Sequence, residues 1–286
     1  DFNKYFMEKL GLKSEQFFVS DTPLDTTYCF SLENIISEEL KQKLTYVPFI
    51  PVQTIKKESM IEEVFKRDLL IHYPFESMKP FLELVKEAAN NPKVKAIKMT
   101  LYRISKDSTL ATYLINAAEN GKEVTVLMEL RARFDENNNI EWAQKLEEAG
   151  CRVIYGMDKF KVHSKICLIT YKDENEFKYI TQIGTGNYNE KTAKIYTDLS
   201  FITSDEEIGV DADKFFKNMA MGNLYGMYKK LWIAPVGFKC NIIKSIEEEI
   251  KKCEEGKEGE IIIKCNSFTD KDIIKELIKA SEKGVK

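Results

Sequence analysis

The chain has 286 residues, of which 43% are hydrophobic and 31% are charged, the composition of a globular protein with a packed core and not of a disordered chain. Its 43 basic and 46 acidic residues leave a net charge of -3, so the chain as a whole lacks the basic excess of proteins that bind nucleic acid or anionic membranes. The longest apolar runs, such as residues 69–71, are far shorter than the roughly 20 residues that a membrane span requires.

Residues 1–58 are expected to be the remnant of an upstream domain followed by a linker. One helical pattern covers residues 32–44, among short apolar clusters and turn residues. Pro48 and Pro51 restrict themselves and their predecessors to extended backbone, which is typical of a linker. This irregular start, and the absence of an initiator methionine, predict that the chain is a piece of a longer protein.

From residue 59 on, short β-branched segments alternate with amphipathic ones. Helices between the first strands predict crossover connections and a parallel sheet, whereas the later strands follow one another directly and predict an antiparallel portion of the same sheet. The fold class is therefore α/β, a mixed sheet flanked by helices. After an apolar run at residues 69–72, strands are predicted at residues 94–101, 124–130, 152–155, 162–170, 179–183 and 199–202, and helices at residues 78–90, 109–120, 140–149 and 205–221.

An internal repeat predicts a duplicated architecture. The matching segments are residues 69–71 with 231–233, 96–98 with 262–264, and 114–115 with 277–278. Generic strand-loop-helix units can match by chance, but the order and spacing of these matches favour duplication. We expect residues 59–224 to form one complete lobe, and residues 225–286 to form the incomplete amino-terminal part of a second one.

Six cysteines occur with no C-x-x-C spacing and no nearby pair of histidines, which argues against zinc ribbons and redox motifs. Buried, reduced thiols are the simpler interpretation. They predict a cytoplasmic location.

His163 is the candidate nucleophile. It lies in the motif K-V-H-S-K on a predicted strand, where alternation would place His163 and Lys165 on one face about 7 Å apart. A neutral imidazole can attack phosphorus to form a phosphohistidine, while the lysine offsets charge on the nonbridging oxygens. A structural histidine is the alternative, and we adopt it for the only other histidine, His72, which lies in an apolar strand.

Further groups suited to phosphate are predicted near His163. Residues 184–187 form G-T-G-N directly after a strand, where two glycines let backbone N–H groups approach an anion and Asn187 adds an amide donor. Arg103 and Arg133 each follow a strand expected to be parallel, so both should lie at the carboxyl edge of the sheet, where ligands of open α/β sheets bind. Guanidinium groups bind phosphate oxygens in bidentate fashion. A plain glycine turn and solvated arginines are the alternatives, and the shared placement favours a phosphate site.

H-x-K followed by G-T-G-N after the next strand, in a duplicated α/β unit, resembles the phospholipase D superfamily. The surrounding motifs are similar to those of the polyphosphate kinase family. They are Tyr102-Arg103, Lys106-Asp107-Ser108, Glu129-Leu130, A-R-F-D-E at residues 132–136, G-T-G-N-Y-N-E-K-T-A at residues 184–193 and Y-T-D at residues 196–198.

This resemblance implies reversible transfer of the terminal phosphate of ATP to inorganic polyphosphate through a phosphohistidine intermediate. His163 matches the phosphorylated histidine of the family, and Tyr196 matches its nucleotide-contacting tyrosine. Lys165 and Asn187 match positions that steady the phosphate. The expected partners are ATP or ADP and polyphosphate, with no nucleic acid, in a homo-oligomer of the full-length protein. Membrane association as part of an oligomeric complex remains the alternative to a purely cytoplasmic enzyme.

Mg²⁺ is the cofactor that the resemblance implies. Arg103 and Arg133 match the pair assigned to the magnesium-phosphate site. Because arginine cannot ligate a cation, we expect these two residues to hold phosphate oxygens whose other faces bind Mg²⁺.

Two departures from the family pattern bear on activity. Thr170 stands where the superfamily has an aspartate, and the family's second active-site histidine would lie in the second lobe, beyond Lys286. We therefore expect little activity from this chain alone. Two other functions remain open: a phosphodiesterase or nuclease of the phospholipase D type that uses His163 with water as acceptor, and a noncatalytic polyanion-binding module.

Overall fold

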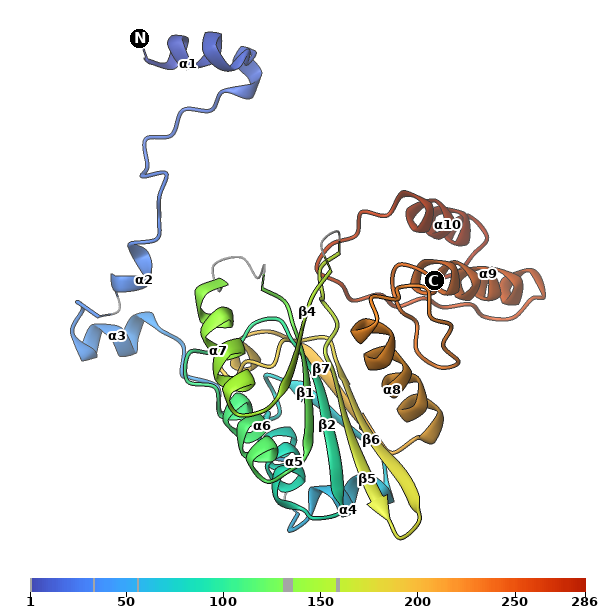
Figure 1. The fold of residues 1–286 in the computed structure, drawn as a ribbon. Coiled ribbons are helices and arrows are strands. Elements are labelled where there is room, and N and C mark those ends of the chain that lie inside the picture. Colours follow the sequence, from blue (N-terminus) through green and yellow to red (C-terminus); the bar gives the residue numbers. More distant parts are fainter. Residues whose placement is uncertain (1, 33, 56, 131–135, 158–159) are drawn as a thin grey trace. The chain divides into compact units, whose positions relative to one another are not determined.

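The computed structural model describes residues 2–32, 34–55, 57–130, 136–157 and 160–286. The chain divides into two compact units, Asp1–Phe49 and Ile50–Lys286 (Figure 1). Each unit is considered by itself.

The first unit contains short helices and no buried residue among those described. Its elements are α1 (Phe2–Leu10), a 3-10 turn (Ser14–Gln16), α2 (Cys29–Leu32) and α3 (Glu38–Leu44). The single helix predicted over residues 32–44 is wrong: the Ser37 side chain accepts a hydrogen bond from the Leu40 backbone N–H at 3.3 Å and starts α3 as a separate helix.

The second unit is built on a mixed sheet that has seven strands among the described residues, in the order β1-β7-β6-β5-β2-β3-β4. β2, β3 and β4 pair in parallel, and every other neighbouring pair is antiparallel. The predicted α/β class with a mixed sheet is confirmed. The strands are β1 (Leu69–Tyr73), β2 (Val94–Leu101), β3 (Glu123–Met128), β4 (Arg152–Tyr155), β5 (Ile166–Asp173), β6 (Glu176–Gly184) and β7 (Asp198–Thr203).

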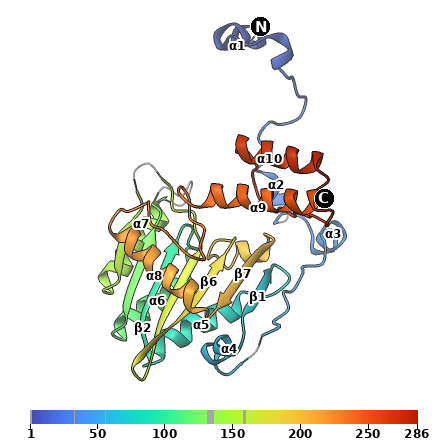
Figure 2. The same ribbon diagram turned by 90° about the vertical axis from the view of Figure 1, so that its right-hand side faces the viewer.

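Helices cover both faces of this sheet, as the two views show (Figures 1 and 2). One face carries α4 (Met60–Lys66), α5 (Lys79–Asn90), α6 (Thr109–Glu119) and α7 (Glu136–Glu148), and the other carries α8 (Glu206–Ala220). The larger hydrophobic core lies under the first group, and a smaller one joins α8 to β3 and β5 through Phe215, Leu127 and Leu168. Since β3 lies between these cores, its last five residues are all buried, which explains its continuous apolar sequence.

Local signals set the helix bounds. Ser108 caps α6 by accepting a hydrogen bond from the Ala111 N–H at 3.1 Å, and Asp205 caps α8 by accepting one from the Ile208 N–H at 2.9 Å. Gly121 ends the α6 segment with a φ of 75°, a conformation that glycine adopts without strain. The α5, α6 and α8 helices therefore begin and end within one or two residues of their predicted bounds.

The strand predicted over residues 162–170 is wrong at its start, because β5 begins at Ile166. Thr100 on β2 explains the difference. Its hydroxyl donates to the Ser164 carbonyl at 2.8 Å and accepts from the Ile166 N–H at 3.0 Å. The Thr100 hydroxyl thus makes the hydrogen bonds that backbone groups would make if the pairing of β2 with β5 continued toward residue 162.

The carboxyl-terminal part of the second unit is a helix pair. α9 (Phe238–Glu254) and α10 (Lys271–Glu282) pack on each other through Ile246, Ile250, Ile273, Ala280 and Val285, and α5 packs on α6 as well. Residues 262–264, which match part of β2, form no ladder among the described residues, and Ile262 is 86% exposed.

The expectation of buried cysteines holds for only two of the six. Cys151 and Cys167 are buried, Cys253 is half-buried, and Cys29, Cys240 and Cys265 are exposed. All six are free thiols.

Candidate functional site

The segments that carry the predicted chemistry meet at one edge of the sheet. The carboxyl ends of β2, β3 and β4 define this edge. Antiparallel pairing brings the start of β5, the end of β6 and the start of β7 to the same edge. Residues distant in sequence, such as Arg103, His163 and Asn187, therefore lie at the same edge of the sheet.

His163 is exposed and lies between β4 and β5, three residues before β5 begins. Its ring meets the ring of Tyr102 edge to face, with the centroids 5.1 Å apart. Desolvation by the surrounding protein, and then the positive charges of Lys165 and Lys161, lower the pKa of His163 below its usual 6.5. The imidazole is thus neutral near pH 7, as a nucleophile must be.

Lys165 is buried, with 6% of its surface exposed, and both it and His163 precede β5, so the prediction that the two residues lie on a strand is wrong. The two residues are nevertheless close, because the Lys165 ammonium donates to the His163 carbonyl at 2.6 Å. Burial lowers the pKa of Lys165 to about 8, and the negative charge of Asp198 partly opposes this shift. An ammonium with a lowered pKa therefore lies beside the exposed imidazole.

Backbone hydrogen bonds join the G-T-G-N segment to the neighbouring strands. The Gly184 N–H donates to the Lys165 carbonyl at 2.9 Å, and the Thr185 N–H donates to the Leu199 carbonyl at 3.0 Å. These two N–H groups are therefore not available to an anion. The Asn187 Oδ1 atom is buried and has no hydrogen-bond partner among the described residues. This atom is an acceptor, so a phosphate oxygen would bind the Nδ2 atom of the same amide.

Gly186 is required by the close approach of Asp198. A Cβ atom at residue 186 would lie 2.5 Å from the Asp198 Oδ2 atom and 2.6 Å from its Cγ atom. The other carboxylate oxygen, Oδ1, accepts from the Thr185 hydroxyl at 2.7 Å. Asp198 thereby holds the glycine-rich segment against the start of β7.

Arg103 is half-buried and lies two residues after the end of β2. Side chains of α7 form hydrogen bonds with the loop backbone on both sides of Arg103. Asn139 donates to the Tyr102 carbonyl at 2.8 Å, and Asn138 donates to the Ile104 carbonyl at 2.7 Å. Arg133 lies outside the described residues, so the predicted pair of guanidinium groups remains a prediction.

Tyr196 lies between a 3-10 turn (Thr192–Lys194) and β7, with 58% of its surface exposed. More than half of this residue is therefore accessible from solvent. In the part of the chain that the structure describes, no group of three or more histidine, cysteine, aspartate or glutamate side chains is arranged to hold a metal ion. The cationic and amide groups at this edge fit a metal that arrives bound to phosphate oxygens.

Comparisons with known proteins decide the family. The model of "Polyphosphate kinase C-terminal domain 1" matches residues 59–224, and that of "Polyphosphate kinase C-terminal domain 2" matches residues 231–286. The chain belongs to the polyphosphate kinase family. The predicted resemblance to this family is confirmed.

Polyphosphate kinases are also the relatives and solved structures to which the chain is similar. The polyphosphate kinase of Staphylococcus epidermidis is 42% identical over 285 residues, and that of Bacillus cereus is 43% identical over 282 residues. These matches cover 99% and 98% of this chain but only 39% and 40% of the relatives' length. The crystal structure of polyphosphate kinase from Porphyromonas gingivalis has 33% identity and a TM-score of 0.77, covering 88% of this chain and 42% of that one.

The roles of two buried polar residues at the site edge were not predicted from the sequence. Glu129, 1% exposed, accepts a hydrogen bond from the Val162 N–H at 2.8 Å and so holds the residue before His163. Asn139, fully buried, donates to the Glu129 carbonyl at 2.9 Å as well as to Tyr102. Two signals in the sequence pointed to Glu129: it follows a buried strand directly, and it lies in the Glu129-Leu130 motif.

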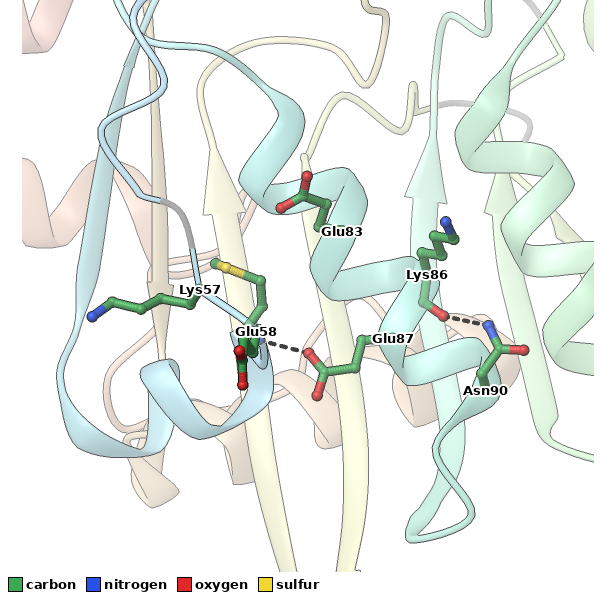
Figure 3. Close-up of a pocket in the computed structure, with 7 residues that line it drawn as sticks. Lys57, Glu58, Glu83, Lys86, Glu87 and Asn90 are labelled. Atoms are coloured by element: carbon green, nitrogen blue, oxygen red, sulfur yellow. Dashed lines mark hydrogen bonds between the residues drawn. The ribbon is translucent and has the colours of Figure 1, made fainter.

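A cavity of about 260 Å³ lies at the opposite edge of the sheet, between the start of α4 and the end of α5 (Figure 3). Glu87 lines this cavity and joins α5 to the start of α4. Its carboxylate accepts hydrogen bonds from the Ser59 hydroxyl at 2.6 Å and from the Met60 N–H at 2.7 Å. None of the predicted site residues lines this cavity. The remaining lining residues are Lys57, Glu58, Glu83, Lys86 and Asn90.

Proposed function

We propose that this chain carries the phosphohistidine part of a polyphosphate kinase site, which transfers the terminal phosphate of ATP reversibly to inorganic polyphosphate. The observation that carries the proposal is the exposed imidazole of His163, with a lowered pKa, beside the buried ammonium of Lys165. Membership of the family supports it.

The proposed reaction has two displacements at phosphorus. The unprotonated ring nitrogen of His163 attacks the terminal phosphorus of ATP, a P–N bond forms, and the bond to the bridging oxygen breaks as ADP leaves. The terminal oxygen of polyphosphate then attacks the same phosphorus, and the P–N bond breaks to regenerate the imidazole. Lys165 stabilises negative charge on the nonbridging oxygens in both steps.

The other predicted residues complete the proposal. Asn187 binds a phosphate oxygen through its amide, and the exposed ring of Tyr196 stacks on the adenine. Arg103 and Arg133 hold phosphate oxygens, and Mg²⁺ supplies charge neutralisation when it is bound to the other faces of those oxygens.

For this chain we propose three parts: residues 1–58 as an upstream remnant and linker, 59–224 as the first catalytic domain, and 225–286 as the start of a second one. The family models, at residues 59–224 and 231–286, support this division. We also propose a cytoplasmic homo-oligomer. In the described residues no helix is long and apolar enough to cross a membrane.

Labelling with γ-³²P-ATP tests the proposed function. Because the chain spans about 39% of the relatives' length, the assay is run on this chain and on a protein of the relatives' full length that includes it. In the longer protein we expect an acid-labile, alkali-stable label that maps to His163 and disappears in His163→Ala, whereas His72→Ala keeps it. Release of ADP without a label on His163 would contradict the proposal, and cleavage of a phosphodiester would point to hydrolysis instead.

A further inference from the structure

Tyr102, His163 and Lys165, at the site edge, each contact the other two. The rings of Tyr102 and His163 meet with centroids 5.1 Å apart and an interplanar angle of 78°. The Lys165 ammonium lies 5.5 Å from the centroid of the same tyrosine ring and donates to the His163 carbonyl at 2.6 Å. Tyr102 therefore contacts both groups to which the phosphotransfer is assigned.

The backbone of Tyr102 is itself fixed. Its carbonyl accepts a hydrogen bond from Asn139, which is fully buried and donates also to the Glu129 carbonyl where β3 ends. The next carbonyls along the loop, those of Ile104 and Ser105, accept from Asn138 and Trp142 of α7. The tyrosine ring thus projects from a backbone that buried donors hold on both sides of Arg103.

We propose that Tyr102 is a positioning residue, whose ring holds the His163 imidazole and the Lys165 ammonium in one fixed arrangement for phosphate. This proposal rests on the proposed function. An aromatic ring presents a negative face to a cation and favours an edge-to-face contact with a second ring. Without the ring, the exposed imidazole loses the contact that orients it, and the ammonium keeps only its bond to the His163 carbonyl.

The inference depends on the ring and not on the phenol hydroxyl, so the chain offers a matched pair of variants. Tyr102→Phe keeps the ring, and Tyr102→Leu removes it. The histidine signals in NMR spectra report the effect directly, because the chain has only two histidines and His72 lies on β1, outside this set of contacts.

In the wild-type chain we expect nuclear Overhauser contacts between the ring protons of Tyr102 and His163. In Tyr102→Leu the pKa of His163 should rise toward 6.5, because the imidazole gains water and so loses part of the desolvation that is the largest cause of its lowered pKa. Tyr102→Phe should leave the pKa of His163 unchanged, and the pKa of His72 should be the same in all three proteins.

Three results would overturn the proposal: no Overhauser contact in the wild-type chain, an unchanged His163 pKa in a folded Tyr102→Leu variant, or equal shifts in the leucine and phenylalanine variants. The Overhauser measurement needs no variant, so the proposal remains testable if Tyr102→Leu fails to fold.

A second measurement separates this inference from the proposed function. In the longer protein, Tyr102→Leu should slow labelling of His163 by about 10- to 100-fold, with Tyr102→Phe restoring the rate. If the NMR results are as expected but no histidine label forms in any variant, the proposed function fails and the structural role of the ring stands. If labelling occurs at the wild-type rate in Tyr102→Leu, the positioning role fails and the proposed function stands.

Discussion

The side-chain hydroxyl of Thr100 accepts a hydrogen bond from the backbone N–H of Ile166 at 3.0 Å, across the boundary between β2 and β5. The same hydroxyl donates to the Ser164 carbonyl, so it bridges the backbone on both sides of Lys165. Thr100→Val keeps the shape but leaves both buried backbone groups without this partner. We expect the variant to lose about 1–3 kcal/mol of unfolding free energy in urea titrations.

Amide hydrogen exchange provides the control for that variant. The Ile166 amide should exchange faster in Thr100→Val and remain protected in Thr100→Ser, which keeps the hydroxyl. Equal protection in the two variants would show that another group replaces the hydroxyl.

Anion binding by this chain should depend on pH through Lys165. Its pKa of about 8 means that the ammonium is charged at pH 7 and loses its charge as the pH rises through 8. We expect magnesium-free tripolyphosphate to bind about tenfold more weakly at pH 9 than at pH 7 in calorimetric titrations. Lys165→Arg keeps its charge over this range, so the affinity of this variant should change much less with pH. The change that remains in the variant measures the titration of the ligand itself. A persistent tenfold change in the arginine variant would exclude Lys165 as the cause.

Gly186→Ala should disrupt the contact with Asp198. The added Cβ atom would lie 2.5 Å from the Asp198 Oδ2 atom, so Asp198 must move and its bond to the Thr185 hydroxyl breaks. We expect a loss of about 1–3 kcal/mol in thermal or urea unfolding. Gly237→Ala is the matched control, because its nearest neighbouring atom would be 3.7 Å away, and it should cost less than about 1 kcal/mol. Equal losses would contradict the steric argument.

The ion pair between Lys98 on β2 and Asp213 on α8, at 2.8 Å, links the sheet to its second layer. Burial raises the pKa of Asp213, but hydrogen bonds from Lys217 and Lys98 and their positive charges outweigh burial, so the net shift is downward. A carboxylate with a lowered pKa stabilises the fold above its unfolded pKa of about 4, and this stabilisation is lost as the pH falls through the folded pKa.

Asp213→Asn should therefore lower the unfolding free energy by about 1–3 kcal/mol at pH 7, and by less as the pH approaches 3. Glu207→Gln, on the same helix but in an exposed pair with Lys229 and Lys230, should change it clearly less than Asp213→Asn does at pH 7. A loss in Asp213→Asn that does not depend on pH would point to packing and not to charge.

Much of the fold could be predicted because its signals are local. The bounds of β2 and β4 follow from short β-branched runs between turn residues, and those of α6 and α8 follow from caps at Ser108 and Asp205. The start of β5 could not be predicted in this way. It is set by Thr100, more than 60 residues away in sequence, whose hydroxyl replaces a backbone partner.

The site, like the fold, combines features that the sequence predicted with features that depend on long-range contacts. Strand direction predicted the edge location of Arg103, because the carboxyl ends of parallel strands meet there. His163 and Asn187 reach the same edge through the antiparallel pairing of β5 with β2 and β6, an order that was not predicted. Side-chain environment did not follow from the sequence. The prediction that Lys165 and His163 alternate along a strand was wrong because both precede β5, and Lys165 is buried with its ammonium bonded to the His163 carbonyl. The contacts of Tyr102 and Asn139 depend on how α7 packs, which no local pattern contains.

The β5–β6 hairpin has the proposed chemistry at one end only. Both of its open ends lead into the site, His163 and Lys165 before β5 and the glycine-rich segment after β6. Eight residue pairs separate these ends from the turn, a span of roughly 25 Å at the usual rise per residue. A fluorophore on Asn175, in that turn, would therefore move with the two strands and report a tilt of the hairpin from a position about 25 Å away from the proposed chemistry.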